Sequence, residues 1–315
     1  MVRGLERNNI QQLLHVARLY YEKNMTQSEI AARIGFSRPT VSRLLEEARS
    51  SGVVTITISH PMERIFSLED ELAASFGLEI VRVSDSSAGD SIESIGQAAA
   101  QLLAELGGNR MILAVSNGRS IAATVNHMPV LHWEKTTVVQ MIGAVGDGLL
   151  PEDSPAVCRR MARRIGGTYA QMPVPLVLEN PELVRALKRE EQISSTLALA
   201  QRADIALVGV GATADSEVGR ILRPYLTEEL TQQILATDAV GHITGHHFNA
   251  AGHHVWTPLC ERTLALELEA LRNIPLRIGV VAGAEKVEAI KGAIAGGYIS
   301  VLVTDASTAR ALLQR

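Results

Sequence analysis

Short polar and basic side chains gather at the start of one expected helix, and their chemistry suits contact with DNA. They are Ser37, Arg38, Pro39, Thr40, Ser42 and Arg43. Arginine binds guanine through two hydrogen bonds, serine and threonine bind phosphates or base edges, and a helix N-terminus itself favours phosphate. Together with Thr26 and Gln27, at the start of the preceding helix, they form the predicted DNA-contacting set.

A second set of polar residues follows apolar runs that predict strands. The loop Ser116-Asn-Gly-Arg-Ser120 separates an expected strand from a helical pattern, where backbone N–H groups can bind an anion such as phosphate. Lys286 ends another expected strand, at the sheet edge where open α/β folds bind ligands. Alone, the loop is also compatible with an ordinary turn and Lys286 with a surface lysine. The predicted effector-binding residues are Ser116, Asn117, Gly118, Arg119, Ser120, Gly143, Gly211, His242 and Lys286.

Histidines are concentrated in one short stretch of the chain. They are His242, His246, His247, His253 and His254. Histidine is a common metal ligand, but no carboxylate or cysteine joins these residues at helical spacing, and glycine-rich turns intervene. We therefore expect a β-hairpin with His242 facing the ligand pocket and the other histidines at the surface or at a subunit contact. The prediction is no metal site, no cofactor and no catalytic residue.

Two expected helices position the DNA-contacting set. Thr26 and Glu29 have the spacing of a capping box, and Gly35 ends the helix that they begin. Ser37 then caps the second helix. The β-branched segment 53–59 predicts a strand after it, so the expected unit is a winged helix-turn-helix, with an ordinary helix hairpin as the alternative.

The rest of the chain alternates apolar β-type runs with helical patterns. Strands are expected over residues 80–83, 111–115, 137–142, 168–172, 204–210, 277–282 and 299–304. Helices are expected between them, for example over 92–106, 155–165, 228–235, 285–295 and 307–313. Nearly continuous apolar strands separated by helices predict a mostly parallel α/β sheet that is covered on both faces.

Composition and charge narrow the class of protein. The chain has 315 residues, of which 46% are hydrophobic and 3% aromatic, enough for a small module and a larger domain with an aliphatic core. Two cysteines, a polar N-terminus and no apolar run of about 20 residues predict a cytoplasmic protein. Residues 1–60 hold eight Lys or Arg and five Asp or Glu, a net charge of +3, which leaves −7 for the remainder of a chain of net charge −4. That distribution suits a DNA-contacting module on an acidic body.

Ordered motifs along nearly the whole chain resemble the SorC family of sugar-responsive bacterial transcription regulators. The motifs are Tyr20-Tyr21, Met25-Thr-Gln-Ser-Glu-Ile-Ala31, the loop at Gly118, Ala206-Leu-Val-Gly-Val-Gly211, Ala239-Val-Gly-His-Ile-Thr-Gly-His-His-Phe248, Val281-Ala-Gly-Ala-Glu-Lys-Val-Glu-Ala-Ile290 and Tyr298-Ile-Ser-Val-Leu-Val-Thr-Asp305. The resemblance implies a winged helix-turn-helix and an effector domain related to ribose-5-phosphate isomerase, glucosamine-6-phosphate deaminase and CoA transferases. It also implies a phosphorylated sugar as effector, a dimer or tetramer, and release of DNA when the effector binds.

The resemblance also assigns roles to single residues. Gly118, Arg119 and Ser120 match the family's phosphate loop, and Lys286 matches a lysine that lines its effector pocket. Three positions depart from the family's pattern: His242 and Asn249 stand where aspartate is usual, and Asn117 stands where an aromatic residue is common. An aspartate in place of His242 would accept sugar hydroxyls, so the histidine puts the family's usual ligand in question.

Three regions are therefore expected: a winged helix-turn-helix over residues 1–60, a linker helix over 61–77, and an effector-binding and oligomerisation domain over 78–315. The chain would be a DNA-binding transcription regulator controlled by a small phosphorylated sugar or polyol. Its partners would be double-stranded operator DNA, that effector and further copies of itself, with no membrane. The alternative is a sugar-phosphate isomerase or deaminase with an appended helix-turn-helix, against which the lack of paired carboxylates at the strand ends argues.

Overall fold

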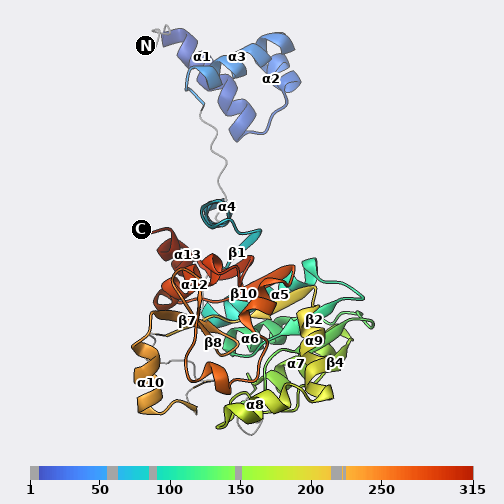
Figure 1. The fold of residues 1–315 in the computed structure, drawn as a ribbon. Coiled ribbons are helices and arrows are strands. Elements are labelled where there is room, and N and C mark those ends of the chain that lie inside the picture. Colours follow the sequence, from blue (N-terminus) through green and yellow to red (C-terminus); the bar gives the residue numbers. More distant parts are fainter. Residues whose placement is uncertain are drawn as a thin grey trace. The chain divides into compact units, whose positions relative to one another are not determined.

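The computed structural model describes residues 7–54, 63–84, 91–145, 151–213, 222 and 225–314. The chain divides into two compact units, Met1–Pro61 and Met62–Arg315 (Figure 1). The helix expected in the connecting segment is α4 (Glu63–Phe76), and its residues Ile65 and Leu72 pack into the core of the larger unit. Among the described residues, no helix is both long and apolar enough to cross a membrane.

Three helices form the first unit. They are α1 (Arg7–Ala17), which a π-helical turn η1 (Arg18–Glu22) continues, α2 (Gln27–Ile34) and α3 (Arg38–Ser50). Their small core consists of Val16, Leu19, Ile30, Ala31, Val41 and Leu45. The wing expected over residues 53–59 lies outside the described residues from 55 onward, while Val53 and Val54 form a bend.

Local hydrogen bonds set the ends of α2 and α3. The predicted capping box is present, because Thr26 accepts from the Glu29 N–H and the Glu29 carboxylate accepts from the Thr26 N–H at 2.8 Å. Gly35 follows in the left-handed region with φ of 73°, which glycine adopts without steric cost. Ser37 then caps α3 by accepting from the Thr40 N–H. The turn between the helices therefore follows from a few neighbouring side chains.

A seven-stranded parallel sheet forms the centre of the larger unit (Figure 1), and its strand order is β1-β11-β10-β5-β2-β3-β4. This confirms the predicted α/β class, and no strand extends more than one residue beyond the range predicted for it, although several are up to two residues shorter at one end. The strands are β1 (Ile80–Ser84), β2 (Ile112–Val115), β3 (Thr137–Gln140), β4 (Thr168–Ala170), β5 (Ile205–Val208), β10 (Leu276–Val280) and β11 (Val301–Asp305).

Alternate residues of the strands point into two separate hydrophobic cores, one on each face of the sheet. In β2, Leu113 and Val115 enter one core and Ala114 enters the other. The first core is completed by α5 (Ser91–Leu106), α6 (Arg119–His127) and α7 (Ser154–Ile165). The second is completed by α4, α9 (Glu191–Gln201), α12 (Val287–Ala295) and α13 (Ala306–Leu313). Both faces are covered, as continuous apolar strands require.

A smaller antiparallel sheet, in the order β6-β7-β8-β9, packs beside the main one. Its strands are β6 (Gly211–Ala212), β7 (Ala239–Ile243), β8 (His246–Asn249) and β9 (His254–Val255). The sequence indicated only the hairpin of this sheet, because its outer strands are two residues long. Short helices α8 (Pro181–Leu187), α10 (Glu228–Leu235) and α11 (Leu268–Arg272) and the 3-10 turns η3 (Cys260–Arg262) and η4 (Ala284–Lys286) complete the unit.

Candidate functional site

The polar start of α3 lies on the surface of the first unit. Every residue of the predicted DNA-contacting set is exposed except Gln27, which is half-buried. Ser37 and Thr40 bond to each other at 2.8 Å between hydroxyls, and Thr26 bonds to Glu29, so these hydroxyls also serve the helix caps. The exposed guanidinium groups of Arg38 and Arg43 therefore carry the charge of this surface.

The order of strands in the main sheet creates a crevice between β2 and β5. The chain leaves β2 toward β3 on one side and leaves β5 toward β10 on the other, so the loops after these two strands diverge. Open α/β sheets bind ligands at such a switch point, outside the carboxyl ends of the strands. A cavity of about 150 Å³ lies there, about ten times the 10–15 Å³ that one water molecule needs on the same measure.

Eight of the nine predicted effector-binding residues line this cavity, although they come from four separate segments. The loop of residues 116–120 follows β2, Gly211 follows β5, His242 lies in β7, and Lys286 lies in η4 after β10. Gly143 does not line the cavity. A Cβ at Gly143 would lie 2.5 Å from the Pro175 backbone, so this glycine permits two backbone segments to approach each other.

The loop after β2 ends at the N-terminus of α6. Gly118, with φ of 112°, is the residue before the helix, and the N–H groups of the first helical turn point outward without partners inside the helix. Some groups of the loop are engaged elsewhere: the Gly118 N–H donates to Glu152 O, and the Ser120 hydroxyl donates to Val280 O at 2.8 Å. The first turn of α6, rather than every group of the loop, is thus the part whose N–H groups can bond to an anion.

Two buried nitrogen atoms of the cavity lining, His242 Nε2 and Asn117 Nδ2, have no hydrogen-bond partner among the described residues. Burial, followed by the nearby His247 and Lys286, lowers the pKa of His242 to about 3, so the ring is neutral at pH 7. Gly211 lies directly under this ring, where a Cβ would come 2.1 Å from Nε2. A neutral imidazole and an amide aimed into a cavity can each bond to a hydroxyl group.

Other cavity-lining residues were not predicted from the sequence. Glu152 precedes α7, Leu176 follows β4, and Thr244 and Gly245 form the turn between β7 and β8. Thr244 and Gly245 both have positive φ, of 52° and 83°, which is the geometry of a two-residue hairpin turn. A glycine between two short β-type runs was the signal for this turn.

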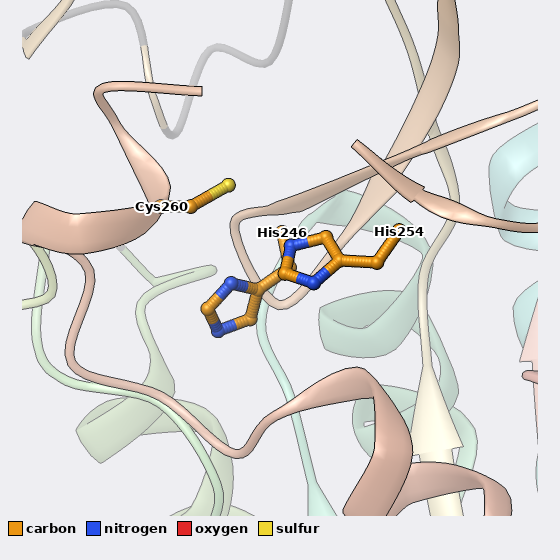
Figure 2. A group of neighbouring side chains, drawn as sticks. All are labelled: His246, His254 and Cys260. Carbon is orange, nitrogen blue, oxygen red and sulfur yellow. The ribbon is translucent and has the colours of Figure 1, made fainter. Parts of the chain in front are cut away.

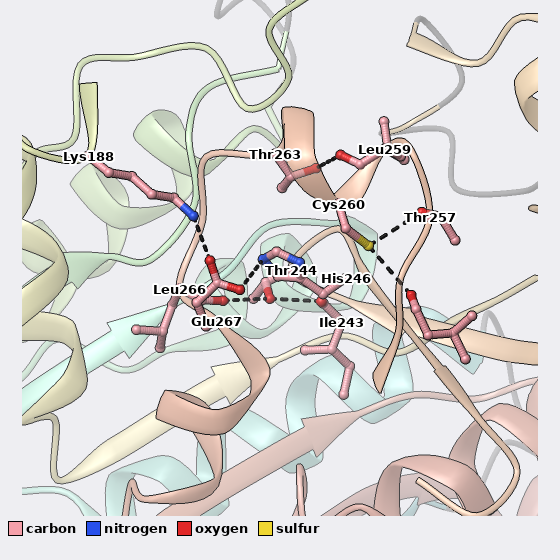
Figure 3. Close-up of polar contacts among 11 residues, drawn as sticks. Lys188, Ile243, Thr244, His246, Thr257, Leu259, Cys260, Thr263, Leu266 and Glu267 are labelled. Carbon is pink, nitrogen blue, oxygen red and sulfur yellow. Dashed lines mark hydrogen bonds and ion pairs between the residues drawn. The ribbon is translucent and has the colours of Figure 1, made fainter. Parts of the chain in front are cut away.

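Two of the remaining histidines do not lie where the sequence predicted. His246 and His247 are each 1% exposed within the single chain, so the expectation of a surface or subunit-contact position is wrong for both, whereas His253 is exposed as expected. The structure also brings Cys260 close to His246 and His254 (Figure 2). Glu267 lies on the other side of His246, with Oε2 3.6 Å from Nε2 (Figure 3).

Each of the two units matches a known domain family. Residues 60–314 match the profile of a sugar-binding domain family, and residues 7–54 match that of homeodomain-like domains. The chain is 33% identical over 309 residues to the transcriptional regulator LsrR of Escherichia coli K12, which covers 96% of this chain and 95% of that protein. It is 32% identical over 317 residues to LsrR of an Enterobacter species, with 98% and 95% covered.

A solved structure has the same architecture over both units. The full-length sorbitol operon regulator SorC from Klebsiella pneumoniae superposes with a TM-score of 0.77 and 30% identity, covering 98% of this chain and 100% of that one. These relatives are named as transcriptional regulators and not as enzymes. They do not favour the alternative of an isomerase with an appended helix-turn-helix.

Proposed function

Since the chain belongs to the SorC family of sugar-binding transcriptional regulators, we propose that a phosphorylated sugar or polyol occupies its sheet-edge cavity and thereby controls its affinity for operator DNA. The observation that carries this proposal is the convergence of the α6 N-terminus, Lys286 and the unpartnered His242 Nε2 on one cavity. A regulator of chromosomal operators acts in the cytoplasm, where we place this chain.

The phosphate group is assigned to the start of α6. The N–H groups of a helix N-terminus carry partial positive charge, and α6 adds Arg119 and Ser120 in its first turn. Lys286 supplies a full positive charge from the opposite wall, at the end of β10. The hydroxyl-bearing part of the ligand would then face His242 and Asn117, whose unpartnered nitrogens are desolvated without compensation until a polar ligand binds.

DNA contact is assigned to the exposed start of α3. Arg38 and Arg43 are the candidates for base edges, with Ser37, Thr40 and Ser42 on phosphates and Thr26 and Gln27 at the start of α2. One such helix covers few base pairs, so two-fold pairing of chains in a dimer or tetramer is expected to present two of them to the two operator half-sites.

The effector can alter DNA affinity only if it binds one arrangement of the subunits better than another. Loops that follow strands line the cavity, and reordering of such loops can shift a subunit interface and hence the spacing of the recognition helices. A coupling of about 1–3 kcal/mol would change operator affinity roughly 5- to 150-fold. We propose that binding releases DNA.

The test begins with a thermal-shift screen of the full chain against pentose, hexose and polyol monophosphates, each beside its unphosphorylated form. A ligand at 100 times its Kd stabilises the protein by about 2.7 kcal/mol. The best ligand is then titrated into operator complexes of wild-type, Lys286→Ala and Lys291→Ala protein. Lys291 lies five residues further along the chain, in α12, and pairs with Glu288 at 3.3 Å, so it is the matched control.

Lys286→Ala protein is expected to bind DNA normally without ligand and to need at least tenfold more ligand for release. Ser120→Ala, combined with Lys286→Ala, should abolish the response. A double variant that responds at wild-type ligand concentrations would place the effector elsewhere. Equal responses to phosphorylated and unphosphorylated forms would exclude the phosphate assignment.

A further inference from the structure

Three side chains with metal-binding atoms converge on one point of the larger unit, away from the effector cavity lining. His246 begins β8, His254 begins β9 and Cys260 begins η3 (Figure 2). One ring nitrogen from each histidine and the cysteine Sγ all lie within 4.8 Å of one another. The chain thus gathers two nitrogens and one sulfur from three separate segments.

Ring nitrogens of both histidines in this cluster are buried without a hydrogen-bond partner among the described residues. His246 is 1% exposed, and neither of its ring nitrogens has a hydrogen-bond partner among the described residues; the same holds for His254 Nε2. A buried polar atom without a partner costs about 1–3 kcal/mol, so this arrangement is unfavourable unless something else bonds to these nitrogens. A bound cation would bond to one ring nitrogen of each histidine.

A carboxylate lies beside one ring nitrogen of His246. Glu267 Oε2 lies 3.6 Å from His246 Nε2, and its other oxygen pairs with Lys188 Nζ at 2.5 Å (Figure 3). Metal-binding histidines usually direct their second ring nitrogen to a carboxylate, which orients the ring and makes it a better ligand. With Nε2 facing Glu267, Nδ1 of His246 remains for a metal.

Cys260 supplies the third donor atom. Its side chain is buried, its Sγ lies 3.3 Å from the Thr257 hydroxyl, and its thiol donates to Val255 O at 3.6 Å. Zinc would displace the thiol proton as it binds, because cysteine coordinates a metal as the thiolate. The other cysteine, Cys158, lies in a separate hydrophobic core, where burial raises its pKa to about 12.

We propose that His246, His254 and Cys260 form a binding site for Zn²⁺, with a fourth position open to water or another ligand. Two imidazoles and a thiolate are the donors that zinc takes in tetrahedral sites, whereas Mg²⁺ and Ca²⁺ require oxygen ligands. Zinc bonds of about 2.0–2.1 Å to nitrogen and about 2.3 Å to sulfur separate neighbouring ligand atoms by roughly 3.3–3.6 Å. Side-chain rotations that shorten separations of up to 4.8 Å to this range complete the site.

The ion would fasten β8, β9 and the η3 turn to one another. The β7–β8 turn immediately before His246 contributes Thr244 and Gly245 to the cavity wall, so zinc would also stiffen that wall. The site itself is independent of the proposed effector, and it reverses the prediction from sequence that the histidines bind no metal. Helical spacing could not reveal it, because the three residues lie in β8, β9 and the η3 turn rather than on one face of a helix.

The experiment uses the full chain, freed of metal by a chelator and then dialysed. Zn²⁺ is titrated in competition with a chromophoric chelator, and Co²⁺ is titrated while the near-ultraviolet thiolate-to-cobalt band and the visible bands of tetrahedral cobalt are recorded. One equivalent per chain is expected, with both sets of bands. No binding, or binding without the thiolate band, overturns the proposal.

Four variants separate the site from adventitious binding. Cys260→Ala should remove the thiolate band and weaken Zn²⁺ at least 100-fold, while Cys158→Ala, at the only other cysteine, should retain both. Glu267→Gln should weaken Zn²⁺ about 10- to 100-fold without loss of the band. Because a change near the buried His246 could disturb folding, His254→Asn, at a half-buried position, is the second ligand variant. Wild-type affinity in either Cys260→Ala or His254→Asn contradicts the proposal.

Discussion

The two units of this chain present their polar chemistry in opposite ways. In the first unit the candidate DNA-binding side chains lie at the starts of α2 and α3, mostly on the surface, around a small cluster of six buried residues. In the larger unit the candidate ligand-binding groups come from four separate segments and line a cavity beside two extensive cores. The positions of the first set of side chains depend on local sequence, and those of the second set depend on the whole sheet.

This difference predicts how each unit responds to change. The exposed arginines of α3, Arg38 and Arg43, can be replaced with little effect on folding, because they contact solvent. The cavity residues cannot be separated from the fold so easily, since His242 packs against Gly211, and Ser120 bonds to the β10 carbonyl of Val280. Function and stability are therefore separable in the first unit and coupled in the second.

The largest expected effect comes from the unequal cores. Leu45→Ala, in the small core, and Leu302→Ala, in the large one, each remove a buried leucine at a cost of about 2–5 kcal/mol. The first loss is expected to unfold the first unit alone, since six buried residues provide little reserve. Amide hydrogen exchange should show loss of protection in α1–α3 only for Leu45→Ala. Simultaneous loss in both units would contradict their independence.

The same contrast explains what the sequence predicted well. Capping residues such as Thr26 and Ser37 act on neighbours three positions away, so their patterns located α2 and α3 directly. The strands of the main sheet were located because each is a continuous apolar run that is buried on both faces. Polar loops directly after those strands then had to meet at one edge, and eight of nine predicted cavity residues do line it.

The errors share one physical cause, which is contact between segments that are distant in sequence. Gly143 is required by the approach of the Pro175 backbone, and no local pattern reveals that neighbour. Likewise, His246 and His247 are buried by the small antiparallel sheet, whose two-residue outer strands are too short to show a period. The missing information was the packing of that sheet against its surroundings.

The second prediction concerns the exposed arginines of α3. Arg43→Ala and Arg38→Ala should each weaken operator binding by about 1–3 kcal/mol while leaving the unfolding transition unchanged. If the arginine contacts bases, its replacement should weaken binding mainly to the specific operator. If it contacts phosphates, its replacement should weaken binding to all sequences alike. Fluorescence anisotropy with operator and scrambled duplexes measures both. Wild-type affinity in both variants would place the recognition surface elsewhere, and Arg110→Ala, in the larger unit, is the control.

The third prediction uses His242, which is half-buried in the cavity wall. Its pKa is lowered to about 3 in the folded chain, so the unfolded chain, with a pKa near 6.5, binds more protons between these values. Stability therefore falls as the pH drops below 6.5, and this residue alone should remove about 2 kcal/mol between pH 7 and pH 5. Urea unfolding of His242→Gln should show a correspondingly smaller loss. Equal pH dependence in the wild-type and His242→Gln proteins would contradict a neutral His242.

The smallest expected effect concerns the first unit and tests whether its helices unfold together or separately. Thr26 makes two hydrogen bonds of the capping box, both on the surface. Thr26→Ala should lower the free energy of unfolding of the first unit by about 1 kcal/mol. Thr26→Ser retains the hydroxyl and should cost little. Because the unit has a small core, that loss should appear as faster amide exchange throughout α2 and α3, with no change in the sheet of the larger unit. If exchange increased only at the first turn of α2, the three helices would not unfold as one cooperative unit, and the first unit would be a set of separately fraying helices rather than a small domain.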